Sequence, residues 1–273
     1  MVSVIIPTYN SVHILKDSLG SVLKQTFKNW EIVVVDDASQ DNTPIMVEKF
    51  IKNNNLVSRF KYCRHEKNMG VAAAKNTGIK ASCGEFVAFL DADDIWFPHK
   101  LEYVMNIFLK FPEVDLVCHN ELLSINGTIT NKLNYSKKTV NLNLNNKTLV
   151  YKNLFLSNFL STSAVTIRRH CLEDEIFDET LLVAEDYDLW LRLSRKYQFY
   201  FLDEFLGEYR KIEANALSND IRRMCTGEVR VLKKNKISIG NIIFYKRIFF
   251  IYLRTTLEIL RRGISRGLIL ADL

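Results

Sequence analysis

The chain has 273 residues, of which 48% are hydrophobic and 25% are charged, as is ordinary for a folded soluble protein. Only 4 Pro and 10 Gly are present, which argues against long disordered linkers. The formal charge of +6 is unevenly placed, because basic residues greatly outnumber acidic ones from Arg222 onward. This asymmetry indicates an anionic surface, a membrane or a nucleic acid, as partner for the C-terminal part.

Short apolar runs alternate with stretches of helical spacing through the first ninety residues. The expected strands are 2–6, 30–35, 60–64 and 86–90, and the expected helices are 12–25, one opening at 41–44, and 71–81. Four strands alternating with helices predict an α/β fold, in which right-handed crossovers build a mostly parallel central sheet flanked by helices.

The second half of the chain has a less regular pattern. The expected helices are 98–111, 185–196 and 219–235, the expected strands are 116–119, 163–168 and 198–210, and the Asn-rich region 120–148 is expected to be a hairpin or loop. The last of these helices is basic, and it begins a predicted C-terminal helical extension.

The five cysteines form no CxxC pair. This pattern predicts reduced thiols in a cytosolic protein, without a zinc site or a disulfide framework. No uncharged apolar run reaches the roughly 18 residues that a membrane span needs, and Met1 leads directly into an apolar strand without a basic leader. We therefore expect a cytoplasmic protein without a signal peptide.

Three carboxylates, Asp91, Asp93 and Asp94, follow the apolar run 86–90. They repel one another at the end of a buried strand unless a cation lies among them. Strand geometry places residues 91 and 93 on the same side, and paired carboxylates suit Mg²⁺ or Mn²⁺. The alternative is a solvated acidic turn that caps the next helix.

Polar clusters also end two other predicted strands, at Pro7–Asn10 and Asp36–Asp37. Ligands of α/β sheets bind at the carboxyl ends of the strands. The three clusters are therefore expected to form one site.

The predicted helix 185–196 begins with two acidic residues, Glu185 and Asp186. Asp186 precedes Leu189, Trp190 and Leu193 by three, four and seven positions, so we expect it to face inward with them as a general base. Stabilisation by the helix dipole, without chemistry, is the alternative explanation for both acids.

Asp188 in the same helix lies four positions before Arg192. Opposite charges at this spacing attract on a helix surface. We expect the two side chains to form a surface ion pair.

Four sequence blocks together resemble family 2 glycosyltransferases of the bacterial surface-glycan type. They are VSVIIPTYN at the start, VVVDDASQDNT at 33–43, NMGVAAAKNTGIKASCGEFVAFLDADD at 68–94 and AEDYDLWLRL at 184–193. They occur in the family's order and spacing, and the resemblance runs from Val2 to about Ser218. It implies the GT-A (Rossmann-like) fold and an inverting enzyme that uses a nucleotide-sugar.

The resemblance also implies roles for individual residues. Tyr9 would lie against the nucleotide base, and Asp37 would form a hydrogen bond with that base. Asp91 would hold the ribose or the sugar and would share the metal with Asp93. Asp186 would be the catalytic base. The donor site is further expected to include Pro7, Asn10, Asn68, Gly70, Lys75 and Ala92. Additional candidates are Glu185, Asp94, Trp190, Arg210 and Lys211.

The chain departs from the family pattern at two places. Lys75 stands where the family usually has Arg, so the charge is kept but the bidentate geometry is lost. The family block Tyr-Arg-x-His reads Tyr209-Arg210-Lys211-Ile212 here, and Ile212 cannot bind a metal. Arg210 or Lys211 is the expected substitute, neutralising the donor diphosphate.

The expected function is transfer of a hexosyl or hexosaminyl group, with Mn²⁺ or Mg²⁺, from a UDP-sugar to a hydroxyl of a glycan or lipid-linked acceptor. Residues 1–115 would bind the nucleotide-sugar, 116–218 would bind the acceptor and supply the base, and 219–273 would form the basic extension. No nucleic-acid partner is expected. The alternatives are a catalytically idle nucleotide-sugar-binding module, a nucleotidyltransferase-like enzyme and a receiver-like signalling domain.

The segment 237–270 is very apolar but is interrupted by basic residues. Arg247, Arg254 and Arg261 are seven positions apart and form one stripe of a helix, opposed only by Glu258. The segment is too charged to span a bilayer and suits an in-plane helix, with its basic edge on the anionic headgroups of the inner membrane. The alternative is packing on the catalytic domain or a homo-oligomer interface, with a solvated Arg stripe.

Overall fold

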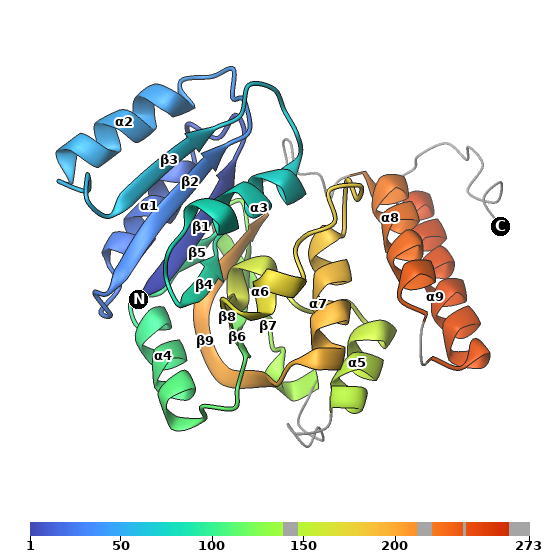
Figure 1. Cartoon of the computed structure of the whole chain (residues 1–273). Helices are drawn as coiled ribbons and strands as arrows, with labels where there is room; N and C mark the ends of the chain where they lie inside the picture. Colours follow the sequence, from blue (N-terminus) through green and yellow to red (C-terminus); the bar gives the residue numbers. More distant parts are fainter. Residues whose placement is uncertain (139–146, 212–219, 237–238, 262–273) are drawn as a thin grey trace.

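The computed structural model describes residues 1–138, 147–211, 220–236 and 239–261 (Figure 1). Its N-terminal half alternates strands and helices as expected. The elements are β1 Val2–Thr8, α1 Leu15–Leu23, β2 Trp30–Asp36, α2 Thr43–Asn53, β3 Phe60–Arg64, α3 Val71–Ala81 and β4 Phe86–Phe89. The four strands pair in parallel in the order β3-β2-β1-β4.

The second half extends the same sheet. Its elements are β5 Ile95–Trp96, α4 Lys100–Lys110, β6 Leu116–Ile125, β7 Thr128–Leu133, α5 Lys147–Leu156, β8 Val165–Arg168, α6 Cys171–Asp174, α7 Glu185–Lys196 and β9 Phe199–Lys211. The strand order continues from β4 through β8, β6 and β9 to β5, with β7 paired to β6. In this half β6 and β9 are parallel, and the other neighbours are antiparallel.

The expected α/β fold is confirmed, and the largest local difference lies at β6. This strand was expected to end at residue 119 but continues to Ile125, where an Asn126-Gly127 turn with positive φ at both residues leads into β7. The pair is thus a two-residue hairpin. The polar side chains of His119, Asn120 and Glu121 are fully buried in β6, so hydropathy alone could not reveal the rest of the strand.

Apolar side chains cover both faces of the parallel strands. Along β1, Val4 and Ile6 pack into one apolar cluster with α1 and α4, whereas Ile5 packs into the other with α3 and α7. A Cβ at Gly78 of α3 would lie only 2.4 Å from Cγ2 of Ile5. This close approach of α3 to β1 requires glycine, and it fixes the helix that carries Lys75 against the sheet.

The C-terminal extension is helical, with α8 Ile221–Lys234 packed against α7 and α9 Asn241–Arg261 packed against α8 (Figure 1). Neither helix, nor any other among the described residues, is long and apolar enough to cross a membrane. Residues 237–238 and 262–270 of the expected in-plane helix lie outside the described residues.

The Arg stripe of α9 is only partly as expected. Arg247 and Arg254 both form ion pairs with Glu228 of α8. Arg247 is thereby turned toward the protein, whereas Arg254 and Arg261 stay exposed. The expected location of the stripe, on headgroups or in solvent, was therefore wrong for Arg247. Glu228 lies on another helix, so the spacing within α9 could not indicate this pairing.

Candidate active site

A cavity of about 810 Å³ lies at the carboxyl ends of β1 and β4 and is bordered by the start of α7 and the end of β9. It brings together most of the residues expected at the site. Pro7, Tyr9, Asn10, Lys75, Asp91, Ala92, Asp93, Glu185, Asp186, Arg210 and Lys211 all line it. Side chains as distant in sequence as Tyr9 and Arg210 therefore share one cavity.

Asp37, Asn68 and Gly70 do not line this cavity. The buried Asp37 carboxylate accepts hydrogen bonds from the backbone N–H groups of Met69 and Gly70, both at 2.8 Å, and its Oδ1 lies 2.7 Å from Nδ1 of His65. Both oxygens of Asp37 are thus engaged by the chain itself. In this structure Asp37 holds the loop that leads into α3.

Asp94 turns away from its acidic neighbours and into the protein. It is 1% exposed and accepts hydrogen bonds from Ser163 Oγ at 2.5 Å and from the backbone N–H of Arg210 at 2.9 Å. Burial raises the pKa of Asp94 well above its ordinary value. Of the three carboxylates after β4, Asp91 and Asp93 therefore face the cavity. Asp94 is instead hydrogen-bonded to the backbone of β9 at Arg210.

Trp190 does not line the cavity either. It is fully buried, and its ring packs against Phe89 of β4 and Phe177, with centroids 6.3 and 6.2 Å away. Its place is in the core beneath α7, so it does not touch the cavity.

Lys75 is the buried cation among the acidic side chains of the cavity. Its Nζ lies 2.9 Å from Glu185 Oε1 and 4.0 Å from Asp91 Oδ1. Burial alone would lower the pKa of Lys75, but the negative charges of Glu185, Asp91 and Asp186 outweigh burial and raise it. Lys75 is therefore charged and balances one of its carboxylate neighbours.

The remaining carboxylates leave an excess of negative charge. Loss of hydration raises the pKa of Asp91 to about 6, with repulsion from Asp93 and Glu185 adding to it and Lys75 opposing it. Burial likewise raises the pKa of Asp93. Oxygen donors with an unbalanced charge are what Mg²⁺ and Mn²⁺ prefer, so Asp91 and Asp93 fit a divalent cation.

Asp186 is the second residue of α7, a helix that begins just after Ala184, whose backbone is left-handed with a φ of 60°. Asp186 Oδ2 accepts a hydrogen bond from Thr162 Oγ1 at 3.1 Å. Burial, followed by repulsion from Glu185, raises the pKa of Asp186 to about 6, against the attraction of Lys75. A half-buried carboxylate with such a pKa is suited to general-base chemistry near neutral pH.

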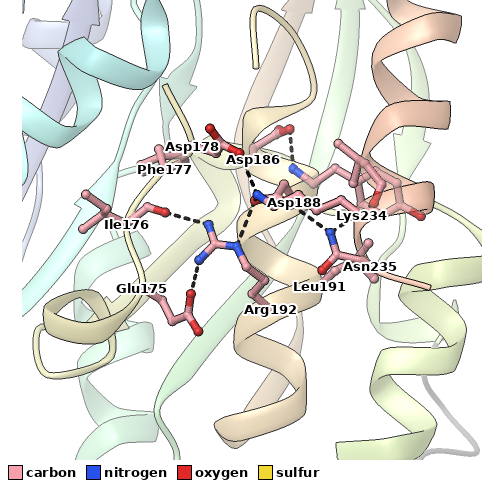
Figure 2. A network of polar contacts seen from close by, with 12 residues as sticks. Glu175, Ile176, Phe177, Asp178, Asp186, Asp188, Leu191, Arg192, Lys234 and Asn235 are labelled. Atoms are coloured by element: carbon pink, nitrogen blue, oxygen red, sulfur yellow. Dashed lines mark hydrogen bonds and ion pairs between the residues drawn. The ribbon is translucent and has the colours of Figure 1, made fainter. Parts of the chain in front are cut away.

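The network in Figure 2 ties α7 to the C-terminal extension. The ion pair of Asp188 with Arg192 exists, at 2.9 Å, but Asp188 is fully buried and the expected surface location was wrong. Asp188 also accepts hydrogen bonds from Lys234 Nζ at 2.9 Å and Asn235 Nδ2 at 2.8 Å. The spacing within α7 predicts the pair but cannot show that α8 covers it.

Arg192 carries this network onward to the segment before α7. Its guanidinium pairs with Glu175 and donates to the carbonyl oxygen of Ile176 at 2.6 Å (Figure 2). The network thus fixes α7, and with it Asp186, from two sides.

We expect Asp188→Ala to lower the free energy of unfolding by about 3 kcal/mol, because it leaves Arg192 and Asn235 without their buried partner. Urea unfolding followed by circular dichroism would measure this loss. Glu85→Ala, which removes a mostly exposed partner of Arg168, is the matched control and should cost less than about 1 kcal/mol. Equal losses in the two variants would contradict a structural role for the buried network.

Several cavity residues carried no recognisable signal in the sequence. They are His13, Tyr135, Asn158–Thr162, Leu182, Val183 and Met224. Thr162 precedes β8 in no recognisable motif, yet it donates to Asp186. Met224 belongs to α8, so the basic extension also forms part of the cavity wall.

The chain is similar to known proteins of one family. Residues 3–174 match the family model described as Glycosyl transferase family 2. Over 226 residues the chain is 32% identical to the UDP-Glc:alpha-D-GlcNAc-diphosphoundecaprenol beta-1,3-glucosyltransferase WfgD of Escherichia coli, covering 82% of each chain. It is 29% identical to the putative teichuronic acid biosynthesis glycosyltransferase TuaG of Bacillus subtilis, covering 80% of this chain and 82% of TuaG.

Solved structures share the fold. S. aureus TarS 1-349 in complex with UDP superposes with a TM-score of 0.63 at 25% identity, covering 86% of this chain and 70% of that one. The mannosyltransferase PcManGT of Pyrobaculum calidifontis, solved with GDP-Man and Mn²⁺, gives a TM-score of 0.65 at 17% identity, covering 98% and 76%.

Proposed function

Because the chain belongs to glycosyl transferase family 2 and is a glycosyltransferase, we propose that it moves a sugar from a UDP-sugar to a hydroxyl of a glycan or lipid-linked acceptor in cell-surface polysaccharide synthesis. The observation that carries the proposal is the meeting of Asp91, Asp93, Glu185 and Asp186 in one cavity with Lys75. Its volume of about 810 Å³ lies within the range of small-molecule sites.

The relatives support the substrate classes. WfgD is named for a UDP-Glc donor and a diphosphoundecaprenol-linked acceptor, and TarS has been solved with UDP. Tyr9 is 47% exposed at the rim of the cavity, where its ring is available to stack on a nucleotide base. These observations favour a UDP-sugar and a lipid-linked acceptor for this chain.

The chain's own residues support an inverting transfer. Asp186 would take the proton from the acceptor hydroxyl as that oxygen attacks the anomeric carbon in line. Thr162 holds the Oδ2 of Asp186 in place, and Lys75 moderates the pKa of that carboxyl. Positioning both substrates in one cavity supplies much of the rate.

Asp93 and Asp91 would hold the divalent cation, Mn²⁺ or Mg²⁺. Bound there, the cation would supply Lewis-acid stabilisation of the charge on the departing nucleoside diphosphate. Arg210 and Lys211 line the same cavity and would add positive charge on the diphosphate side. In this structure the guanidinium of Arg210 pairs with Asp17 at 3.2 Å. On donor binding Arg210 would exchange the Asp17 carboxylate for the donor diphosphate. Ile212 lies outside the described residues.

Donor class is tested by a thermal-shift panel of UDP-, GDP-, CMP- and dTDP-sugars with and without Mn²⁺. A matching donor at a hundred times its Kd should raise the Tm by about 5 °C or more, because binding to the folded state stabilises it. We expect this shift for UDP-sugars with Mn²⁺. Equal shifts for all four nucleotides, or none, would contradict the proposed donor.

A second assay separates an enzyme from an idle binding module. Slow hydrolysis of a radiolabelled UDP-sugar, stimulated by Mn²⁺, is expected of the enzyme. Binding without any hydrolysis would favour the idle module.

A further inference from the structure

Helix α9 has a second apolar face that nothing in the described structure covers. Its inner face buries Phe244, Ile248, Ile251, Thr255 and Ile259, and the helix packs against α8. Its outer face carries Ile242, Tyr245, Phe249, Leu253, Leu257 and Leu260, all between 41% and 84% exposed. These six recur every three or four positions, so they form one stripe on the side of α9 away from α8. A contiguous exposed apolar surface of this kind marks a contact site.

The charge around this outer face selects the class of partner. Helix α9 itself contains four Arg and Lys residues and one Glu residue. Lys246 is exposed within the outer face, and Arg254 and Arg261 are exposed along its border. Glu228 is already paired with Arg247 and Arg254. The excess of positive charge opposes contact with a second copy of the same face and complements an anionic surface.

We propose that the outer face of α9 docks on an anionic lipid membrane. Its aromatic and aliphatic side chains would enter the boundary between headgroups and acyl chains, while Lys246, Arg254 and Arg261 would meet lipid phosphates. One feature differs from the arrangement expected from the sequence, because Arg247 contacts Glu228 of α8 instead of the headgroups.

The docking surface lies close to the proposed active site. Helix α8 separates α9 from α7 (Figure 1) and contributes Met224 to the cavity wall. A membrane against α9 would therefore place the cavity near the lipid surface. This consequence for a lipid-linked acceptor rests on the proposed function, whereas the docking itself does not.

Vesicle flotation of the full-length protein tests the docking surface. The probes are phosphatidylcholine vesicles with and without phosphatidylglycerol. We expect flotation with the anionic vesicles, a smaller bound fraction without phosphatidylglycerol, and a further decrease at high salt. The double variant Leu253→Gln, Leu257→Gln should weaken the partition coefficient about tenfold or more, because it removes two apolar side chains from the lipid contact.

The matched control is the double variant Ile45→Gln, Leu109→Gln. These two side chains are 52% and 75% exposed on α2 and α4, and their replacement should leave flotation unchanged. Circular dichroism melts verify that both variants fold.

Absence of flotation with anionic vesicles, or equal flotation of the two double variants, would overturn the proposal. So would a wild-type dimer in light scattering that Leu253→Gln, Leu257→Gln dissociates, because a second copy would then occupy the face. The donor thermal shift is measured without lipid, so a failed donor assay and a failed docking surface remain distinguishable.

Discussion

Replacing Asp186 by Asn should lower turnover about 100-fold or more and leave donor affinity close to that of the wild type. Asn keeps the size of the side chain and can still contact Thr162, but it cannot accept the proton of the acceptor hydroxyl. Transfer kinetics with a saturating donor would measure turnover, and the thermal shift with the donor would measure binding. The substitution should therefore slow the chemical step and leave donor binding unchanged.

The pH profile provides an independent check on this role. Burial and the neighbouring Glu185 raise the pKa of Asp186 to about 6, so the base becomes protonated, and therefore inactive, as the pH falls through this value. Wild-type turnover should decline on the acid side near pH 6, and the residual activity of Asp186→Asn should lack that decline. A collapse of donor affinity in Asp186→Asn would instead make Asp186 a binding residue, and Glu185 would become the leading candidate for the base.

Asp93→Ala should abolish measurable transfer and remove the Mn²⁺-dependent part of the donor thermal shift, while the protein remains folded. The physical reason is the charge at this site. Burial raises the pKa of Asp93, which means that its charged form is unfavourable in the metal-free protein. Removing the carboxylate should therefore leave the Tm of the metal-free protein unchanged or higher, and removing it should weaken cation binding strongly.

The matched control is Asp174→Ala, which removes an exposed carboxylate from α6, outside the cavity. It should behave as the wild type in both assays. If Asp93→Ala retained full transfer and a Mn²⁺-dependent shift, the divalent cation would have to be held elsewhere.

The acidic residues at the strand ends are the part of the site that the sequence pattern predicts. Apolar runs that end in Pro7–Asn10 and Asp91–Asp94 predict strands whose carboxyl ends meet, and the structure places Asn10, Asp91 and Asp93 around one cavity. Two of the three expected strand ends meet there, because parallel strands bring their carboxyl ends to the same edge of a sheet, whereas Asp37 after β2 does not line the cavity. This rule requires only local patterns and chain order.

Contacts with distant segments determine which of those acids face the cavity and which are held inside the protein. Asp37 and Asp94 resemble Asp91 and Asp93 in their local sequence, yet the first is held by the loop before α3 and the second by Ser163. A carboxylate faces solvent or the interior according to which donors surround it. Those donors lie 32 and 69 residues away.

The sequence by itself determined the family, the α/β alternation, the acidic ends of the strands and the amphipathic character of α7 and α9. These features depend on short periodicities and on motifs in a fixed order. Only the tertiary structure decided that Asp188 is buried, that Thr162 holds Asp186, and that Arg247 faces Glu228 instead of a lipid surface. Each of these outcomes depends on which remote element packs against the residue, and burial and charge pairing arise only when such elements meet.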